Sequence, residues 1–104
     1  MSGWQRFPSM NRTERRLLQF NFAPEISASD SIVSGSPVLY VSIVQGTDAS
    51  PMARIEGDAA INVGVVEVWF RATLRGIYRI RCVVTLASGS ILELPAELHV
   101  EDGA

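Results

Sequence analysis

The sequence predicts an all-β protein: a single β-sandwich of about seven strands, preceded by an extended N-terminal arm. Three observations lead to this fold class. Apolar and polar residues alternate in several short runs, as they do along half-buried strands. Turn-forming residues separate these runs at intervals of roughly 8–12 residues. No stretch places apolar residues at the spacing of an amphipathic helix, so a helical fold is not expected.

Length and composition fit one folded domain. The chain has 104 residues, of which 47% are hydrophobic and 19% are charged, so a buried core is expected. The formal net charge is −2, whereas nucleic-acid binders need a strong positive field, so no nucleic-acid partner is expected. All nine basic residues are arginines, which suit interfaces but are also favoured by GC-rich codons.

Residues 1–16 differ from the rest of the chain and are expected to form an extended basic and aromatic arm outside the core. They hold four arginines against one glutamate, with large apolar side chains between them. Pro8 prevents one continuous helix because it lacks a backbone N–H. A frayed terminus is the alternative, but a tryptophan in such a segment favours burial against a partner. The residues expected to bind a partner are Trp4, Arg6, Phe7, Met10, Arg12, Arg15 and Arg16.

The predicted sandwich spans residues 17–101, followed by a short tail at 102–104. Leu18, Phe20 and Phe22 alternate with polar residues, which indicates that they share the inward face of a first strand. A segment rich in small polar residues then predicts a loop.

The middle of the sandwich begins with the sequence VLYVSIVQG at 38–46. This run is β-branched and partly apolar on both faces, as in an interior strand. The sequence TDASP at 47–51 predicts a loop that the side chains of Asp48 and Ser50 can hold through bonds to the backbone. Residues 52–57, MARIEG, are expected to form a short strand.

Residues 60–74 hold one strand or two, with Gly64 as the expected break or bulge. Two long strands are then predicted at 78–87 and 91–100. Pro95 interrupts the second of these strands. Because a central ladder needs the N–H that proline lacks, Pro95 predicts a bulge or an edge position.

The strand at 78–87 shows the clearest alternation in the chain. Gly89, in the sequence ASGS, supplies the positive φ of a short hairpin that leads to the last strand. The alternate residues that are expected to face the core are Tyr78, Ile80, Cys82, Val84 and Leu86.

The last two predicted strands resemble those of immunoglobulin-like domains. Gly-x-Tyr opens the penultimate strand, Ser-Gly forms the turn, and the final strand ends in LHV. In antibody-type domains a disulfide cysteine follows the tyrosine by two residues. Here Ile80 occupies that place and Cys82 comes two positions later, so the resemblance implies the sandwich without the disulfide. The resemblance covers roughly the final 30 residues.

No motif for catalysis, metal binding or a cofactor is apparent, so the protein is expected not to be an enzyme and to need no cofactor. Cys82 is the only cysteine and lies in an apolar run, which predicts a buried structural thiol. His99 is the only histidine, and one histidine with one cysteine does not make a zinc site. The acidic residues near the C-terminus are interpreted as a solvated face and not as a glycosidase pair.

The plan of the whole chain resembles small accessory structural proteins of tailed bacteriophage virions. It combines a basic arm, an FNF strand, a GTDASP loop and the strand GIYRIRCVVTLASGS. The resemblance implies a non-enzymatic subunit that docks on the neck, the tail or the fibre-attachment region, or on the capsid surface as a decoration protein. Its implied partners are capsid, portal or adaptor, tail or fibre proteins, with many copies in a symmetric assembly.

The N-terminal segment has no apolar run long enough for a signal peptide or a membrane span. We therefore expect synthesis in a cytoplasm and no membrane partner. The phage resemblance implies that this is the host bacterial cytoplasm and that the protein resides in the virion. The alternative function is a small binding module for a carbohydrate or a host surface protein. Trp69 and Phe70 keep this alternative open, because adjacent residues on a strand face opposite sides and one of them must point outward.

Overall fold

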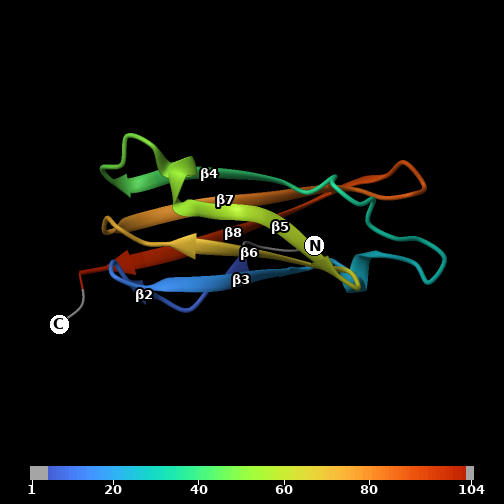
Figure 1. Ribbon diagram of the computed structural model, residues 1–104, viewed down its shortest axis with the longest axis horizontal. Coiled ribbons are helices and arrows are strands. Elements are labelled where there is room, and N and C mark those ends of the chain that lie inside the picture. The colour runs from blue at the N-terminus through green and yellow to red at the C-terminus, as the bar shows by residue number, and fades with distance from the viewer. Residues whose placement is uncertain (1–4, 103–104) are drawn as a thin grey trace.

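The computed structural model describes residues 5–102, and these residues form two facing β-sheets (Figure 1). The prediction of an all-β protein is confirmed. The first sheet has the order β1-β8-β7-β4, and β2 pairs β8 further along. Its strands are β1 (Gln5–Arg6), β2 (Met10–Asn11), β4 (Val38–Gly46), β7 (Gly76–Thr85) and β8 (Ile91–Glu101).

The second sheet is antiparallel and has the order β3-β6-β5. Each of the two 3₁₀ turns, η1 and η2, has a proline among its first residues. The N–H that proline lacks would have no hydrogen-bonding partner within the turn at this position. The expected strand at 52–57 is wrong in its first half, because η2 occupies that part and the strand starts afterwards. These elements are β3 (Arg15–Asn21), η1 (Ala23–Glu25), η2 (Pro51–Arg54), β5 (Ile55–Asn62) and β6 (Val65–Arg71).

The core lies between the two sheets and follows the predicted alternation. The five residues expected to face inward from β7 and its end are all buried, and they meet the inward side chains of β3 and β6. Phe70 packs edge-to-face against Tyr78, with ring centroids 5.5 Å apart. The largest fully buried side chains are Tyr78, Phe20, Phe22, Phe70, Met10, Leu18, Ile80 and Leu98.

The expected break at Gly64 agrees with the structure, whereas Pro95 lies in an interior strand and not at a bulge or on an edge strand. Gly64 has a φ of +80° and closes the turn between β5 and β6, so residues 60–74 hold two strands. Pro95 is paired with Arg81 of β7, and within the described residues β1 joins the other side of β8 only from Ala96 onward. Within the described residues Pro95 therefore has a strand neighbour on one side only, which limits the number of ladder bonds that its missing N–H could affect.

The expectation that residues 1–16 lie outside the core is wrong for the part that the structure describes. β1 and β2 run parallel to β8 and extend its sheet. Phe7 and Met10 are only 8% and 2% exposed, and both belong to the hydrophobic core. The domain therefore includes this segment, which we call the N-terminal edge (Gln5–Asn11).

A bulge explains why the sequence pattern concealed the N-terminal edge. Gln5 is in register with Ala96 and Met10 with Val100, so five steps along the edge match four steps along β8. The extra residue falls around Pro8, where a ladder donor is missing in any case. Phe7 and Met10 consequently both face inward although they are three positions apart, which breaks the alternation of a regular strand.

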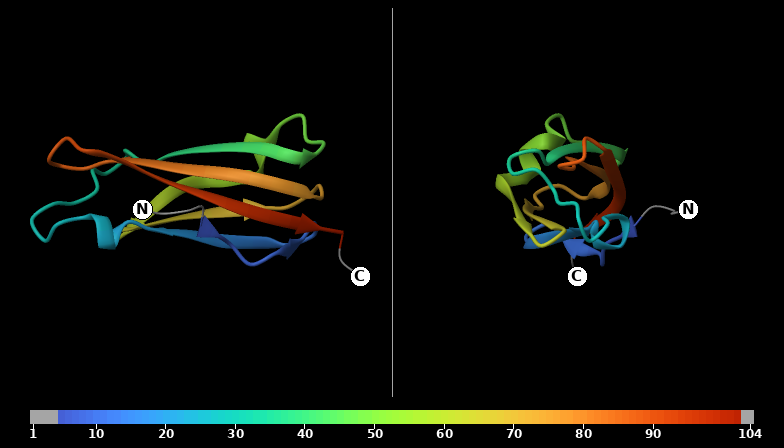
Figure 2. Two further views of the ribbon diagram at one scale, coloured as in Figure 1. Left: turned by 180° about the vertical axis from the view of Figure 1, so that it is seen from behind. Right: turned by 90° about the vertical axis from the view of Figure 1, so that its right-hand side faces the viewer.

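The molecule is elongated, with extents of 47 × 28 × 21 Å (Figure 2). The long loop after β3, the β5–β6 turn and the β7–β8 hairpin lie together at one end, which we call the loop end. The β2–β3, β4–β5 and β6–β7 connections and the end of β8 lie at the other end.

Candidate interaction surface

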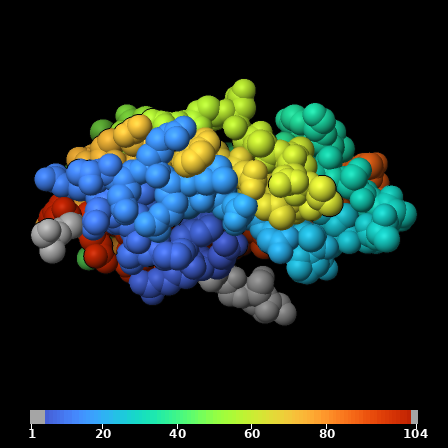
Figure 3. All heavy atoms as spheres, turned by 60° about the horizontal axis from the view of Figure 1, so that its bottom comes forward, coloured from blue at the N-terminus to red at the C-terminus, as the bar shows by residue number. Residues whose placement is uncertain are grey.

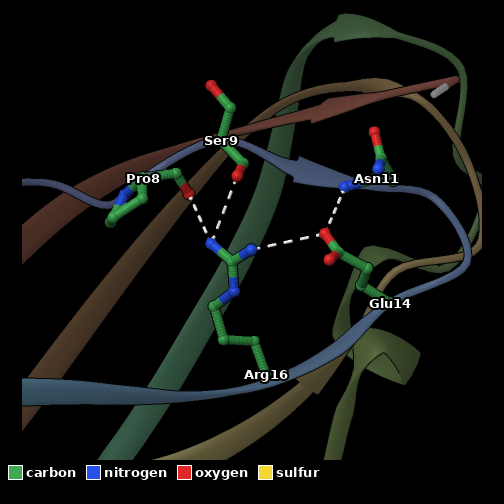
Figure 4. Close-up of polar contacts among 5 residues, drawn as sticks. All are labelled: Pro8, Ser9, Asn11, Glu14 and Arg16. Atoms are coloured by element: carbon green, nitrogen blue, oxygen red, sulfur yellow. Dashed lines mark hydrogen bonds and ion pairs between the residues drawn. The ribbon is translucent and has the colours of Figure 1, made fainter. Parts of the chain in front are cut away.

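Arg16 holds the bulge of the N-terminal edge in place (Figure 4). Its Nη1 donates to the carbonyl oxygens of Pro8 and Ser9 at 3.0 and 3.2 Å. Its Nη2 contacts Oε1 of Glu14 at 3.3 Å, and the same carboxylate accepts the backbone N–H of Asn11 at 2.6 Å. Arg16 was predicted to bind a partner, but the structure uses its guanidinium within the chain.

Among residues 5–102, the other predicted partner-binding residues do not form one surface. Trp4 lies outside the described residues. Phe7 packs edge-to-face on Phe20, with centroids 5.4 Å apart, and Met10 is buried. These two side chains are therefore not available to a partner, which corrects that part of the prediction. Arg12 is exposed and forms an ion pair with Asp102 at 3.3 Å.

Arg6 takes part in a polar cluster on the outer face of the first sheet. Its guanidinium lies 3.3 Å from Nδ1 of His99, and Nε2 of His99 lies 3.0 Å from Oε1 of Glu97. Both contacts are hydrogen bonds when the imidazole is neutral and carries its proton on Nε2. The hydrogen bond from His99, with nearby arginine charges including Arg6, lowers the pKa of Glu97.

Arg15 is the predicted partner-binding residue that lies beside an exposed aromatic side chain, where it can contact another protein. It lies on the outer face of the second sheet, with its guanidinium carbon 4.0 Å from the ring centroid of Trp69. The register places Leu17 and Glu56 directly opposite Trp69 on the two neighbouring strands. We call these four residues, together with Arg71, the Trp69 platform.

One carboxylate links the two arginines of the Trp69 platform. Glu56 accepts hydrogen bonds from Nε of Arg15 at 2.6 Å and from Nε of Arg71 at 2.7 Å. These two bonds lower the pKa of Glu56, so the carboxylate is charged at neutral pH. Trp69 remains 38% exposed beneath Arg15, whereas Phe70 is buried. Tryptophan and arginine are the side chains that most often dominate protein interfaces.

The sequence anticipated only part of the Trp69 platform. The prediction that either Trp69 or Phe70 faces outward is confirmed. The contributions of Glu56 and Arg71 were missed, since neither stands out locally. Their meeting depends on the pairing of β5 and β3 with β6, and no signal in the sequence specifies that register.

A second polar cluster is buried at the end opposite the loop end. The hydroxyl of Tyr78 donates to Oδ2 of Asp48 at 2.7 Å, with the carbonyl of Leu74 at 3.3 Å. The Asp48 side chain is 2% exposed, and its Oδ2 lies 3.3 Å from Nε of Arg54. That nitrogen is an ion-pair partner but is not aligned for a hydrogen bond. Burial and the neighbouring carboxylate raise the pKa of Tyr78, so its hydroxyl stays protonated.

The Asp48 cluster joins the β4–β5 connection to the start of β7 and is a structural element. The backbone N–H of Ser50 donates to Oδ1 of Asp48 at 2.9 Å, as the turn prediction expected. Arg54 also donates to the hydroxyl of Thr73. Each polar group that Asp48 brings into the interior thus meets an opposite charge or a hydrogen-bonding partner.

Potential metal ligands are not gathered in the part of the chain that the structure describes. Residues 5–102 contain no group of three His, Cys, Asp or Glu side chains placed to hold a metal ion. Nor does any helix in that range have the length and apolar character needed to cross a bilayer. Cys82 is fully buried, and burial raises the pKa of its thiol to about 12.

Cys82 should accordingly be inert in the native protein. We expect a thiol reagent at pH 8 to modify it at least about 1,000-fold more slowly than in the protein denatured with guanidinium chloride, because reaction requires unfolding. Stability should also fall as the pH rises above the ordinary thiol value of 9.0, since the unfolded chain then loses a proton that the folded chain retains. Labelling followed by mass spectrometry checks the first expectation. Fast modification of the folded protein would contradict the burial of Cys82.

Comparison with protein-family models and with curated proteins finds no match for this chain.

Proposed function

We propose that the protein is a non-enzymatic structural subunit that docks on a larger protein assembly, and that this assembly is the virion of a tailed bacteriophage. It is made in the host bacterial cytoplasm and occupies the neck, tail or fibre-attachment region, or decorates the capsid, in many copies. Its partners are capsid, portal or adaptor, tail or fibre proteins. The placement in a virion rests on the resemblance of the arm, FNF strand, loop and GIYRIRCVVTLASGS plan.

The observation that carries the docking role is the Trp69 platform. Trp69 presents a large exposed surface whose position is already determined by Arg15 above the ring and by Glu56 beside it. A side chain that is immobilised before binding loses little rotamer entropy on docking, which favours affinity. Repetition of a modest contact around a symmetric assembly then gives strong attachment through avidity.

We also propose that the sandwich is immunoglobulin-like. Its β3-β6-β5 sheet corresponds to strands B, E and D of that fold, and its β4, β7 and β8 to strands C, F and G. Tyr78 stands near the start of β7, and its hydroxyl lies 3.3 Å from the carbonyl of Leu74, four residues upstream. A tyrosine at this corner is a recurrent feature of immunoglobulin-like domains.

A carbohydrate-binding module is the second candidate function, and exposed Trp69 is the observation that favours it. Sugars stack on open aromatic faces, but Arg15 already covers one face of this ring at 4.0 Å. Glycan-array binding by the isolated protein, lost in Trp69→Ala, would support this second function. Co-purification with particles that do not carry the glycan would support the structural role.

The docking role predicts that Trp69→Ala weakens incorporation into particles by at least about 10-fold, as expected for an interface anchor worth more than 1.4 kcal/mol. Particles produced from the genome that encodes the chain are purified, and the amount of bound protein is measured by quantitative mass spectrometry. Because Trp69 faces outward, the variant should keep the circular dichroism spectrum of the parent protein.

Tyr40→Ala is the matched control. Tyr40 is also an exposed strand aromatic with an arginine over its ring, since Arg81 lies 4.7 Å from the centroid, but it belongs to the other sheet. We expect the incorporation of this variant to stay within about 2-fold of the parent, the scale of a residue outside the interface. Equal losses for both variants would contradict the assignment of docking to the Trp69 platform. Absence of the parent protein from particles would refute the structural role itself.

A further inference from the structure

The turn between β5 and β6 holds a valine in a conformation that valine rarely adopts. Asn62 pairs with Val65, so Val63 and Gly64 form a two-residue hairpin loop, with φ angles of +45° and +80°. Such turns favour Asn-Gly, because both central residues need a positive φ. A β-branched residue there is a true outlier and strains the backbone. The sequence reads INVGVV, which places an unsuitable residue at the first of the two positions that need a positive φ.

The strained valine is also the most exposed of the large hydrophobic residues at the loop end. Val63 is 90% exposed, and it borders an apolar groove of about 290 Å³. Ile26 and Ile32, from the loop after β3, line the groove together with Ile61. Figure 3 shows the yellow residues of this turn beside the cyan residues of the loop, at the end away from the dark blue N-terminal edge. We call Val63 and these three isoleucines the apolar tip.

The apolar tip is held in a fixed shape. The carbonyl of Gly64 accepts the backbone N–H of Phe22 at 2.9 Å, which fastens the turn to the end of β3. The contact is so close that a Cβ on Gly64 would lie 3.2 Å from the Cβ of Ala23. Across the groove, Asp30 accepts the Ser88 hydroxyl at 2.6 Å, which joins the loop to the β7–β8 hairpin. A rigid surface loses little entropy when a partner covers it.

The charged residues in the three segments that form the apolar tip and its surroundings are all acidic. The segments 22–37, 57–67 and 84–93, which converge toward this end, contain no Arg, Lys or His, and all nine arginines lie elsewhere in the chain. Glu25 lies in η1 and Asp30 lines the groove. Hydrogen bonds from the Ser88 side chain and from backbone N–H groups lower the pKa of Asp30, so this carboxylate is ionised at neutral pH. The tip is thus an apolar knob beside acidic groups.

We propose that the apolar tip is a docking surface for a protein partner that presents an apolar pocket bordered by Arg or Lys side chains. Val63 inserts into that pocket, and the basic border lies against Glu25 and Asp30. The backbone strain at Val63 fits this role, because an asparagine would suit the turn better but would leave nothing apolar to insert. This inference rests on the proposed function and adds to the Trp69 platform a second contact, at the end of the long axis.

The distinguishing experiment uses Val63→Asn, which should stabilise the fold and weaken docking at the same time. Relief of the strained turn should raise the Tm by about 4–8 °C, the shift that corresponds to one favourable turn substitution in a domain of this size. Incorporation into purified particles should fall at least about 10-fold, because the inserted side chain becomes polar. Glu25→Arg should also lower incorporation, and the parent protein should be released from particles more readily as the NaCl concentration rises.

Val44→Asn is the matched control, since Val44 is an exposed valine on β4, distant from the loop end. Its incorporation should match that of the parent protein. If the parent is incorporated and Val63→Asn is incorporated equally, the inference about the apolar tip is wrong while the proposed function stands. If the parent is absent from particles, the proposed function fails and the inference fails with it. Loss of self-association of the free protein in Val63→Asn would identify a second copy as the occupant and overturn the stated partner. A lower Tm for Val63→Asn would contradict the strain argument.

Discussion

Deletion of residues 2–11 is expected to destabilise the protein by more than about 5 kcal/mol and to leave much of the chain unfolded at 37 °C. The deletion removes two core side chains, Phe7 and Met10, whose individual truncation costs about 3–5 and 2–5 kcal/mol in typical cores. It also opens the edge of β8 and leaves Arg16 without the carbonyls of Pro8 and Ser9. Because native domains are stable by only about 5–15 kcal/mol, the Tm should fall by at least about 20 °C in thermal denaturation.

Two neighbouring single substitutions provide the control for this deletion. Phe7→Ala should lower stability by about 3–5 kcal/mol, because its ring packs on Phe20 inside the core. Arg6→Ala should cost less than about 1 kcal/mol, because its contact with His99 is exposed. A deletion variant that melts like the parent would mean that the N-terminal edge is not part of the domain. Particle incorporation is therefore best tested with point variants, since the deletion would remove the fold together with any contact.

Asp48→Ala is expected to destabilise the protein by about 3–5 kcal/mol, the usual result of removing one partner from a buried ion pair. The Asp48 side chain is almost completely buried, and its loss leaves the positive charge of Arg54 in a largely buried position without compensation. The hydroxyl of Tyr78 and the backbone N–H of Ser50 lose an acceptor at the same time. Chemical denaturation measures the change in the free energy of unfolding.

Asp58→Ala is the control for this effect, since Asp58 is an exposed carboxylate in the next strand and should change stability by less than about 0.5 kcal/mol. Tyr78→Phe removes only the hydroxyl and should cost about 1–2 kcal/mol. In the double variant that combines Asp48→Ala with Tyr78→Phe, the total loss of stability should be smaller than the sum of the two single losses, because the hydroxyl and the carboxylate share one hydrogen bond. Strict additivity would mean that the two groups do not interact.

The two faces of β6 serve the core and the Trp69 platform respectively. On β6, the inward residues Val66, Val68 and Phe70 are buried, while Trp69 between them stays exposed under Arg15. Successive side chains of a strand point to opposite faces. The burial of Val68 and Phe70 therefore places Trp69 on the outer face, where the platform lies. Substitutions that shift this register would be expected to remove the platform and the core packing together.

The sequence by itself determined the all-β fold class and the inward faces of β3 and β7. The expectation that residues 38–46 form an interior strand was wrong, because β4 lies at the edge of its sheet as described and Tyr40 on its outer face is exposed. Alternation at a period of two is a local property, so the inward set from Tyr78 to Leu86 and the turns at Gly64 and Gly89 could be read without the structure. The buried state of Cys82 followed from the same alternation.

Only the tertiary structure decided where the N-terminal residues lie and which side chains meet. The N-terminal edge pairs with β8, some 90 positions later, through a bulge at Pro8 that moves Phe7 and Met10 to the same side. Arg15, Glu56 and Trp69 converge because three separate strands pair in one register, and each residue taken alone has an ordinary sequence context. Local sequence patterns specify which face of a segment is apolar. The strand with which that segment pairs depends on the competition among all segments for the same sheet edges and the same core.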